Sequence, residues 1–465
     1  MKHPWYNDAI FYHIYTFSLA RAPFYNDYAE EGHGLAEITK WIPHIREMGC
    51  DAVLFSPVLQ SRSHGYDVTD YFRVDSRIGS NAEFRSLVET FHEAGIRVVL
   101  DSVLNHCGRD FFAFRELQKG DRKYTDWFSG VDFSRESPLG DPFTYDTWSG
   151  YFELVKFNLK NDETSAYLLD AVRFWIDEFA VDGLRLDSAN VMDFDFMRRL
   201  RKVTTEKKPD FWLMGEVVSG DYADWVAPDL LHSVTNYKLY KALYSSHNNQ
   251  NLFELAHSVQ ESVPLHGLPL YAFLDNHDQP RIASNLTDPA HLRTLYTLLY
   301  TLPGLPSLYY GSEWGIPGVK ENGSDQPLRP WIDADNPPVD PAGLAAYIGL
   351  LAKIRRTHSA LRYGDYRQGR LEYRRPFVFA RFDESEHVFV AVNITDHEET
   401  VAPDDLADAD LSGRLGLSRL SCLSCLYDAL SGETFTGGVI PMGPHSARIL
   451  VPIYAGAPEG EHMHE

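Results

Sequence analysis

The sequence predicts an α/β fold: a (β/α)8 TIM barrel with an inserted subdomain, followed by a C-terminal antiparallel β-sandwich domain. Three observations support this prediction. Eight short apolar runs alternate with amphipathic helical runs over about the first 340 residues. One interval between these runs is too long for a loop. The residues that follow this region show the alternating pattern of β-strands. The chain has 465 residues, too many for one ordinary core.

Most of the strand candidates are near-continuous apolar runs, such as DAVLFSP and IRVVLDSV, which is typical of strands buried on both faces. The candidates are Ala9–Tyr15, Asp51–Pro57, Ile96–Val103, Gly183–Ala189, Phe211–Val217, Leu230–Tyr237, Leu270–His277 and Leu305–Glu313. Helical stripes of 3.6 periodicity separate them, as in Leu35–Ile45, Phe84–Phe91 and Leu168–Phe179. An open doubly wound sheet is the competing fold, but the Gly-rich turn GxGxxG is absent after the first strand.

The interval from Asn105 to a helix that starts near Asp162 exceeds 50 residues. A structureless loop of that length is improbable in a compact domain, so residues 107–158 are predicted to form an inserted subdomain over the barrel mouth. Residues 1–106 and 159–366 then form the barrel, which includes a helix Pro341–Leu361. Residues 367–465 form the β domain, in which LEYRRPFVFARFD, HVFVAVNITD and SARILVPIYA alternate as strands and the final GAPEGEHMHE is a loose tail.

Bulk composition excludes several classes of protein. The formal net charge of −23 argues against nucleic-acid and anionic-membrane partners, because no run of Lys and Arg offsets it. No stretch approaches the roughly 20 apolar residues of a membrane span, and polar residues interrupt MKHPWYNDAIFYHIYTF, so we expect no signal peptide. Four cysteines make no disulfide scaffold, and the CxxC of Cys422 and Cys425 lacks a second pair. These features predict a cytoplasmic protein.

Polar residues stand where the predicted strands end. The third strand ends in DSVLNH, which closes with His106, and the fourth ends in GLRLDSAN, which places Arg185 and Asp187 on the same side of the strand. The fifth ends in MGEVV with Glu216, and the seventh in FLDNHDQPR with His277 and Asp278. Because strand carboxyl ends meet at one mouth of a barrel, these side chains are expected to converge.

Converging carboxyl groups are the requirement of glycoside hydrolysis, in which one attacks or stabilises the anomeric carbon and the other protonates the leaving oxygen. Asp187 suits the first role because Arg185 favours its ionised form. Glu216 suits the second because a dry site with carboxylate neighbours favours the protonated form that a general acid needs. Asp278 would hold sugar hydroxyls. A lone Asp at a strand end is more often a helix cap or an ion-pair partner; the co-occurrence of several favours chemistry.

These motifs resemble the α-amylase family of glycoside hydrolases. The resemblance also covers the segments HGYDVTDYFRVDSRIGS and LPGLPSLYYGSE. It implies a barrel with an inserted B domain and a C-terminal β domain, and it implies a role for each site residue. Asp187 would be the nucleophile, Glu216 the acid/base and Asp278 the transition-state stabiliser. The implied substrate-binding residues are Tyr66, His106, Arg185, His277, Asp325 and Arg329.

Two departures from the family pattern change what the resemblance implies about metal binding and domain organisation. Asn190 and Val191 replace a Lys–His pair that many members carry, so we expect no family calcium site and no required metal or cofactor; Asn105 matches one calcium ligand only. LVKFNLKN resembles the neopullulanase–cyclomaltodextrinase members, yet the first strand begins within ten residues of the start, which suggests a compact intracellular enzyme. Aromatic residues of the insertion could stack on the aglycone sugars or pack the insertion: Phe143, Tyr145, Trp148 and Tyr151.

The leading functional hypothesis is hydrolysis of α-1,4-glucosidic bonds in maltooligosaccharides or cyclodextrins, with a covalent glucosyl-enzyme and retention of configuration. A same-fold glucosyl transferase or isomerase, or an α-1,6-glucosidase, is the alternative. A non-catalytic sugar-binding protein is a further one, which the complete acidic trio disfavours. The expected partner is an α-glucan oligosaccharide, with no nucleic acid and no membrane, and the chain is expected to act as a monomer or a homodimer.

Overall fold

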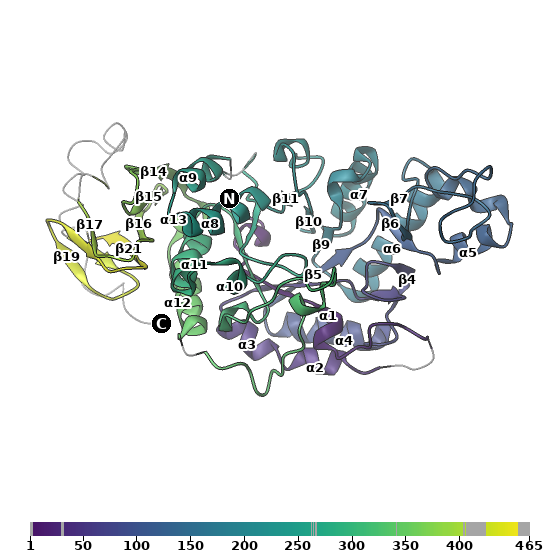
Figure 1. Ribbon diagram of the computed structural model, residues 1–465, viewed down its shortest axis with the longest axis horizontal. Helices are drawn as coiled ribbons and strands as arrows, with labels where there is room; N and C mark the ends of the chain where they lie inside the picture. The colour runs from purple at the N-terminus through teal and green to yellow at the C-terminus, as the bar shows by residue number, and fades with distance from the viewer. Residues whose placement is uncertain are drawn as a thin grey trace.

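The computed structural model of the chain describes residues 3–28, 32–261, 263, 265, 267–340, 342–402, 405 and 425–453. Figure 1 shows a central barrel with the C-terminal strands at its left and a lobe around α5 (Phe112–Gln118) at its right. No helix of the described part is long and apolar enough to cross a membrane.

Eight parallel strands form the barrel, in the order β11-β10-β9-β5-β2-β1-β13-β12. A parallel bridge between Thr235, just after β11, and Tyr271 of β12 joins the two ends of the sheet. Each strand lies within one of the eight predicted ranges, so this part of the prediction is confirmed. The strands are β1 (Phe11–Ile14), β2 (Ala52–Phe55), β5 (Arg97–Ser102), β9 (Gly183–Leu186), β10 (Trp212–Gly215), β11 (Ser233–Val234), β12 (Tyr271–Phe273) and β13 (Leu305–Tyr309).

The apolar runs reflect burial on both faces of the barrel strands. Phe11 of β1 stacks on Trp212 of β10 at 4.8 Å between ring centroids, although these strands are not neighbours in the sheet, so both rings lie inside the barrel. The next residue, Tyr12, belongs to the larger core between the sheet and the helices. Alternate residues of one strand therefore pack into two different cores, and both faces of the strand are apolar.

Helices surround the barrel. Ser80 and Glu83 form a capping box at the start of α4, and the predicted stripe from Phe84 to Phe91 is buried. The stripe Leu35–Ile45 is divided between two short helices, because the chain turns at residues 40–41; Pro43 lies in the first turn of the second helix. The helices are α1 (Thr16–Leu19), α2 (Leu35–Thr39), α3 (Ile42–Glu47), α4 (Asn81–Glu93), α6 (Asp162–Phe179), α7 (Phe194–Lys207), α8 (Tyr237–Asn248), α9 (Phe253–Gln260), α10 (Ile282–Asn285), α11 (Leu292–Thr301), α12 (Leu344–Thr357) and α13 (Ser359–Tyr363).

Short 3-10 turns connect several of these elements. They are η1 (Trp5–Asn7), η2 (Arg122–Trp127), η3 (Ala189–Val191), η4 (Tyr222–Asp224), η5 (Pro289–His291), η6 (Ser312–Trp314) and η7 (Gln326–Leu328). The single helix predicted over Pro341–Leu361 is instead the pair α12 and α13, because His358 adopts an extended conformation between them. Pro341 itself lies outside the described residues.

The long interval after β5 holds regular structure. β6 (His106–Gly108), β8 (Tyr151–Lys156) and β7 (Thr147–Trp148) form an antiparallel sheet, and α5 and η2 lie between β6 and β7 in the chain. A hairpin of β3 (Leu59–Ser61) and β4 (Val68–Val74) follows β2, where the sequence pattern predicts no strands.

The C-terminal part is antiparallel, as predicted. One sheet has the order β14-β15-β16-β21-β18-β19 and a second pairs β17 with β20, with apolar side chains of both sheets in one core. β14 begins at Asp365 and so straddles the predicted boundary at residue 367; Cys422 and residues 456–465 lie outside the described residues. The strands are β14 (Asp365–Gln368), β15 (Phe377–Phe382), β16 (His387–Asn393), β17 (Glu399–Val401), β18 (Cys425–Asp428), β19 (Thr434–Thr436), β20 (Ile440–Met442) and β21 (Ser446–Pro452).

Candidate active site

A cluster of three carboxyl groups surrounds one guanidinium at the carboxyl ends of β5, β9 and β10. Arg185 donates to both oxygens of Asp101 at 2.7 Å, to Asp187 at 3.2 Å and to Glu216 at 2.7 Å. Parallel register explains the meeting, because Asp101 of β5 lies opposite Arg185 of β9 and Glu216 directly follows β10. Asp187 and Glu216 therefore face the same space.

Ser188 fixes both of these carboxyl groups. Its hydroxyl donates to Asp187 Oδ2 at 3.0 Å, and its backbone N–H donates to Glu216 Oε2 at 3.1 Å. The chain turns sharply here, since Ser188 has a left-handed φ of 52°. Tyr237, at the start of α8, donates its hydroxyl to Glu216 Oε1 at 3.3 Å. Each carboxyl group is thus held from two or more sides.

The electrostatics of the cluster differ from the prediction for Asp187. Arg185 alone was expected to keep this carboxyl ionised, yet burial raises the pKa of Asp187 well above its ordinary value, and Glu216 and Asp101 add to the effect of burial against Arg185. One guanidinium cannot neutralise three carboxylates. Burial and the two neighbouring carboxyl groups therefore outweigh Arg185 and favour the protonated form of Asp187.

The second part of the site continues from Asp101. Tyr66, in the turn of the β3–β4 hairpin, donates its hydroxyl to Asp101 Oδ2 at 2.8 Å and contacts His277 Nε2. His277 lies 2.9 Å from Asp278, and Arg329 donates to Asp278 at 2.8 Å. Burial opposes ionisation of Asp278, but His277 and Arg329 outweigh it and hold the pKa of this carboxyl well below its usual range.

Arg329 extends the network to the last predicted residue. Its guanidinium donates to Asp325 at 3.2 Å and to the backbone oxygen of His277 at 2.9 Å. Hydrogen bonds and ion pairs, with Asp101 as the link between Arg185 and Tyr66, thus connect eight of the nine predicted residues into one network: Glu216, Asp187, Arg185, Tyr66, His277, Asp278, Arg329 and Asp325.

His106 lies outside this network. It is 1% exposed on β6, and its ring centroid lies 5.9 Å from that of Trp148. Burial lowers the pKa of His106 to about 3, so the ring is neutral at physiological pH. Its Nε2 is buried and meets no hydrogen-bond partner among the described residues, which leaves it available to a ligand hydroxyl.

Three residues of the cluster were given no role from the sequence: Asp101, Ser188 and Tyr237. Asp101 begins the DSVLNH motif, and the parallel pairing of the third and fourth strands would have placed it beside Arg185. Ser188 and Tyr237 act through a turn and a helix start, for which the sequence carries no comparable signal.

The aromatic residues of the insertion divide into two pairs. Phe143 and Tyr145 are 0% and 4% exposed and pack on Phe114, so they belong to the core of the insertion rather than to a sugar surface. Tyr151 is 60% exposed and stacks on Trp148 at 5.8 Å with 23° between the ring planes. Because Trp148 also contacts His106, this second pair borders the site.

The surroundings of Asn105 do not fit a calcium site. Its Oδ1 is buried without a partner in the described structure, which is one free oxygen. Within the residues that the structure describes, the one group of three potential Asp, Glu, His or Cys ligands lies elsewhere, at Asp288, His291 and His445. Calcium takes about 6–8 oxygen ligands, and the expectation that the chain requires no metal stays a prediction.

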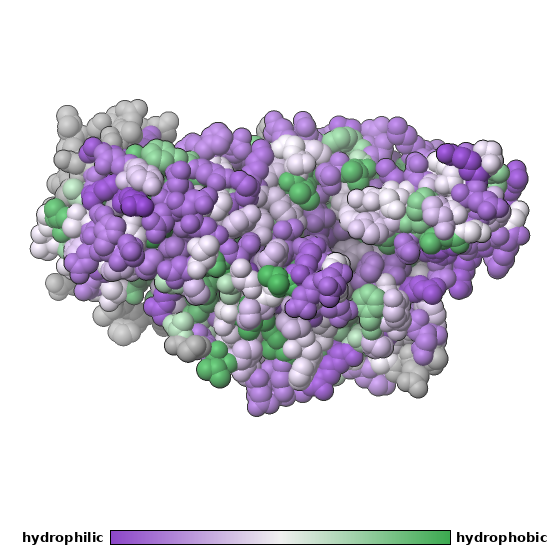
Figure 2. Space-filling model, viewed as in Figure 1, coloured by the Kyte–Doolittle hydropathy of each residue, from purple (hydrophilic) through white to green (hydrophobic). Residues whose placement is uncertain are grey.

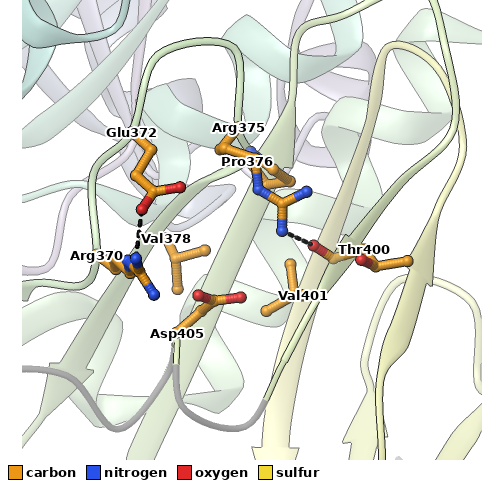
Figure 3. A pocket seen from close by; sticks show the side chains of 8 residues that line it. All are labelled: Arg370, Glu372, Arg375, Pro376, Val378, Thr400, Val401 and Asp405. Atoms are coloured by element: carbon orange, nitrogen blue, oxygen red, sulfur yellow. Dashed lines mark hydrogen bonds and ion pairs between the residues drawn. The ribbon is translucent and has the colours of Figure 1, made fainter.

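Two hollows are visible on the molecule. On the face in Figure 2 the surface is largely hydrophilic and is hollowed between the barrel and the lobe of the insertion. A small pocket in the C-terminal β domain has two arginines in its wall (Figure 3), but Arg370 pairs with Glu372, and Arg375 pairs with Glu399 and Thr400. Its charges are neutralised within the domain, so it offers no comparable site.

Comparisons with known proteins identify the family of the barrel. The family model of the alpha-amylase catalytic domain matches residues 21–337. A cyclomaltodextrinase from a Bacillus species is 31% identical over 84% of this chain and 73% of that protein, and neopullulanase 2 from Thermoactinomyces vulgaris is 30% identical over 84% and 67%. The chain spans 51% of a maltogenic alpha-amylase from Bacillus acidopullulyticus and 77% of alpha-amylase 2 from Dictyoglomus thermophilum.

Among solved structures, the ligand-free cyclic alpha-maltosyl-(1→6)-maltose hydrolase from Arthrobacter globiformis superposes with a TM-score of 0.79 at 25% identity. The match covers 97% of this chain and all of that one. The family match spans more than half of the sequence, and it falls on the barrel that carries the carboxyl cluster. The chain therefore belongs to the alpha-amylase family of glycoside hydrolases.

Proposed function

We propose that the chain cleaves α-1,4-glucosidic bonds of maltooligosaccharides and cyclodextrins through a covalent β-glucosyl-enzyme, with net retention of configuration. The observation that carries the proposal is the placement of Asp187 and Glu216 on one guanidinium and one serine, so that both face the same space. Glycoside hydrolysis needs two carboxyl groups of this kind, one on each side of the scissile bond.

The two carboxyl groups divide the reaction. In the first step an oxygen of Asp187 attacks the anomeric carbon while Glu216 gives its proton to the departing oxygen, so that the aglycone leaves as an alcohol. In the second step Glu216 takes a proton from water, whose oxygen displaces Asp187 from the anomeric carbon. The shared contacts with Arg185 and Ser188 support this division, because they hold Asp187 and Glu216 at one place in the site.

The remaining residues would bind the reacting glucose. Asp278 is held ionised beside Arg329, and a carboxylate can accept hydrogen bonds from sugar hydroxyls that tighten as the ring flattens. Tyr66 offers a ring face, and it stacks on His277 at 5.5 Å. His106 offers a free nitrogen from the side of the insertion. Asp325 and Arg329 would line the following glycone subsites.

Substrate choice rests on the relatives and on the insertion. Curated relatives at about 30% identity include a cyclomaltodextrinase, a neopullulanase and a maltogenic alpha-amylase. The exposed pair Trp148 and Tyr151 suits the aglycone side of such a substrate, because the apolar face of a pyranose stacks on aromatic rings. Cleavage of α-1,6 bonds is the second candidate, since one solved structure that superposes over its full length is a hydrolase of cyclic alpha-maltosyl-(1→6)-maltose.

Product analysis tests the proposal. The enzyme is incubated separately with maltoheptaose, β-cyclodextrin, pullulan, isomaltose and sucrose, and the products and their initial anomeric form are followed by proton NMR. We expect opening of β-cyclodextrin to an α-anomeric product at a rate that matches or exceeds cleavage of maltoheptaose. Isomaltose cleavage would favour the α-1,6 candidate, and new disaccharides in place of free sugar would favour transfer or isomerisation. Initial β-anomers would refute the covalent mechanism.

We also propose that the reaction requires no metal and that the chain acts as a monomer or a homodimer. Nothing in the steps above depends on a cation, because Arg185 and Arg329 supply the positive charge at the site. Activity is therefore expected to survive dialysis against a chelator, and sedimentation velocity measures the oligomeric state.

A further inference from the structure

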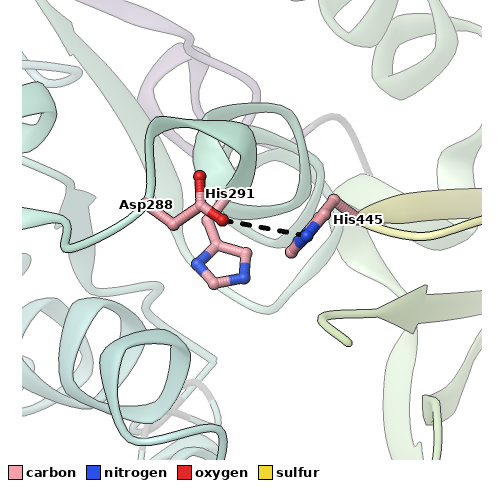
Figure 4. Close-up of side chains that lie close together, drawn as sticks. All are labelled: Asp288, His291 and His445. Atoms are coloured by element: carbon pink, nitrogen blue, oxygen red, sulfur yellow. Dashed lines mark ion pairs between the residues drawn. The ribbon is translucent and has the colours of Figure 1, made fainter. Parts of the chain in front are cut away.

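A second cluster of ligand-type side chains lies between the barrel helices and the C-terminal β domain (Figure 4). Asp288 and His291 belong to the turn η5 that leads into α11, and His445 lies in the turn between β20 and β21. One ligand atom of each residue lies within 4.8 Å of the others. The cluster belongs to neither the carboxyl site nor any step of the proposed reaction.

Backbone carbonyls at the end of β16 position both histidines. His291 Nε2 lies 3.0 Å from the oxygen of Ile394, and the backbone N–H of His445 donates to the oxygen of the next residue, Thr395, at 3.1 Å. A carbonyl can only accept, so Nε2 of His291 carries the proton and Nδ1 carries a lone pair. Metal-binding histidines are held by this kind of second contact.

The lone pair of His291 is buried and unused. The residue is 2% exposed, and its Nδ1 has no hydrogen-bond partner among the described residues. Nδ1 of His445 is likewise buried without a partner in the described structure. A buried polar atom normally has a partner, and these two nitrogens belong to rings whose centroids lie 4.7 Å apart, which points to a ligand between the two segments.

Asp288 supplies a half-exposed carboxylate beside the two rings. Its Oδ1 caps η5 by accepting from the N–H of Ala290 at 2.9 Å, whereas its Oδ2 lies 3.8 Å from His445 Nε2, beyond hydrogen-bond range. His247, whose ring also adjoins His291, is no further ligand, because both of its nitrogens have partners at Leu243 and Thr294.

We propose that Asp288, His291 and His445 bind one Zn²⁺ ion that ties the C-terminal β domain to the barrel. Two imidazoles and a carboxylate, with water at the fourth position, are ligands that zinc accepts. Zinc bonds of about 2.0–2.2 Å place tetrahedral ligand atoms about 3.4 Å apart. The side chain of Asp288 is 49% exposed and can move to close the remaining gap.

The expected consequence is stability. α11 packs against β16 and β21, and the ion would join the turn before α11 to the turn before β21. Zinc at 100 times its dissociation constant should raise the Tm by about 3 °C for a chain of this size. The expected effect on kcat is nil, because the ligands are outside the carboxyl site.

The test compares zinc binding by the untagged wild type and three variants. His445→Asn removes the imidazole at a left-handed position (φ 46°) that Asn tolerates, and Asp288→Asn keeps an oxygen for the cap of η5. The control is His33→Ala, which removes a surface histidine that pairs with Glu83. After chelator treatment and dialysis, titration calorimetry with ZnCl₂ gives affinity and stoichiometry, and the absorption of bound Co²⁺ reports tetrahedral geometry.

We expect one equivalent of Zn²⁺ in the wild type and in His33→Ala, with the rise in Tm. Both cluster variants should bind at least tenfold more weakly and lose the rise. Because His462 and His464 could also bind metal, the difference between variants decides the matter. Equal affinity in all four proteins, or no binding at one equivalent, would overturn the proposal. Sugar hydrolysis by the zinc-free enzyme is measured separately, so a failure of either proposal is distinguishable from a failure of the other.

Discussion

Replacement of Glu216 by Gln should separate the two chemical steps. Glu216 Oε1 accepts from Arg185 at 2.7 Å and Tyr237 at 3.3 Å, and the Gln oxygen can keep both contacts. The Gln amide would instead face the N–H of Ser188, so one buried hydrogen bond is lost. That loss costs about 1–3 kcal/mol, or about 1–3 °C in Tm for a chain of this size. The variant should therefore fold.

Its activity should depend on the leaving group. A general acid contributes about 10²–10⁴-fold, which is about 3–5 kcal/mol of barrier. We expect Glu216→Gln to hydrolyse maltotriose more slowly by that factor. With α-maltosyl fluoride, whose fluoride leaves without protonation, the first step should persist and the covalent intermediate should accumulate as a burst of fluoride. Added azide should then release it as α-maltosyl azide.

Asp187→Asn is the matched comparison. Asn can accept from Arg185 and meet the hydroxyl of Ser188, so the local contacts survive while the nucleophile is lost. We expect no burst of fluoride from this variant, and azide should yield the β-azide because it replaces the missing carboxylate. Fluoride release is followed with an electrode and azide products by NMR. The assignment is refuted if Glu216→Gln cleaves maltotriose within tenfold of the wild-type rate, or if Asp187→Asn gives the burst.

Three further predictions concern stability and binding. The pKa of Asp187 in the folded protein lies above its unfolded value of about 3.9. The stability of the wild type should therefore fall relative to that of Asp187→Asn as the pH rises from about 3.9 through the folded pKa. Urea unfolding at several pH values should show a constant difference in stability below about pH 3.9, and a rise in place of the fall would contradict the raised pKa. Tyr66→Phe removes the hydroxyl that contacts Asp101 and His277. Because a hydrogen bond to a charged group contributes about 1.5–3 kcal/mol, kcat/KM should fall about 10–100-fold. An unchanged kcat/KM would exclude a role for the hydroxyl. Tyr151→Ala should raise KM for β-cyclodextrin several-fold, whereas Tm and the KM for α-glucosyl fluoride should not change. Equal effects on both substrates would place the ring outside the aglycone side.

The barrel could be predicted from sequence because its strands are buried on both faces. Phe11 and Tyr12 fill different cores, so the strand appears as an unbroken apolar run that no surface helix shares. The hairpin of β3 and β4 lacks such a signal, since its strands are short and Asp70 and Arg73 interrupt the apolar pattern. This hairpin depends on tertiary contacts that the local sequence pattern does not show. The role of Tyr66 in the site could therefore be assigned only through the family resemblance.

The same limit applies within the site. Arg185 and Asp187 are two residues apart on one strand, and that spacing alone placed them on one side. Tyr237 reaches Glu216 from the start of a helix that follows another strand, and the length and tilt of that connection are set by packing. The pKa of Asp187 could not be inferred either, because burial, the main cause of its rise, and the charge of Asp101 become visible only in the fold, whereas the neighbouring Arg was visible in the sequence.

The excess of negative charge in the cluster connects the fold to its function. Asp101 accepts both shorter bonds from Arg185 Nη1, which leaves Asp187 the longer contact at 3.2 Å and the less complete neutralisation. A fully neutralised Asp187 would be a weaker nucleophile. Folding the cluster together therefore lowers stability at neutral pH, and the closed barrel, whose strands hold these positions in register, makes that arrangement possible.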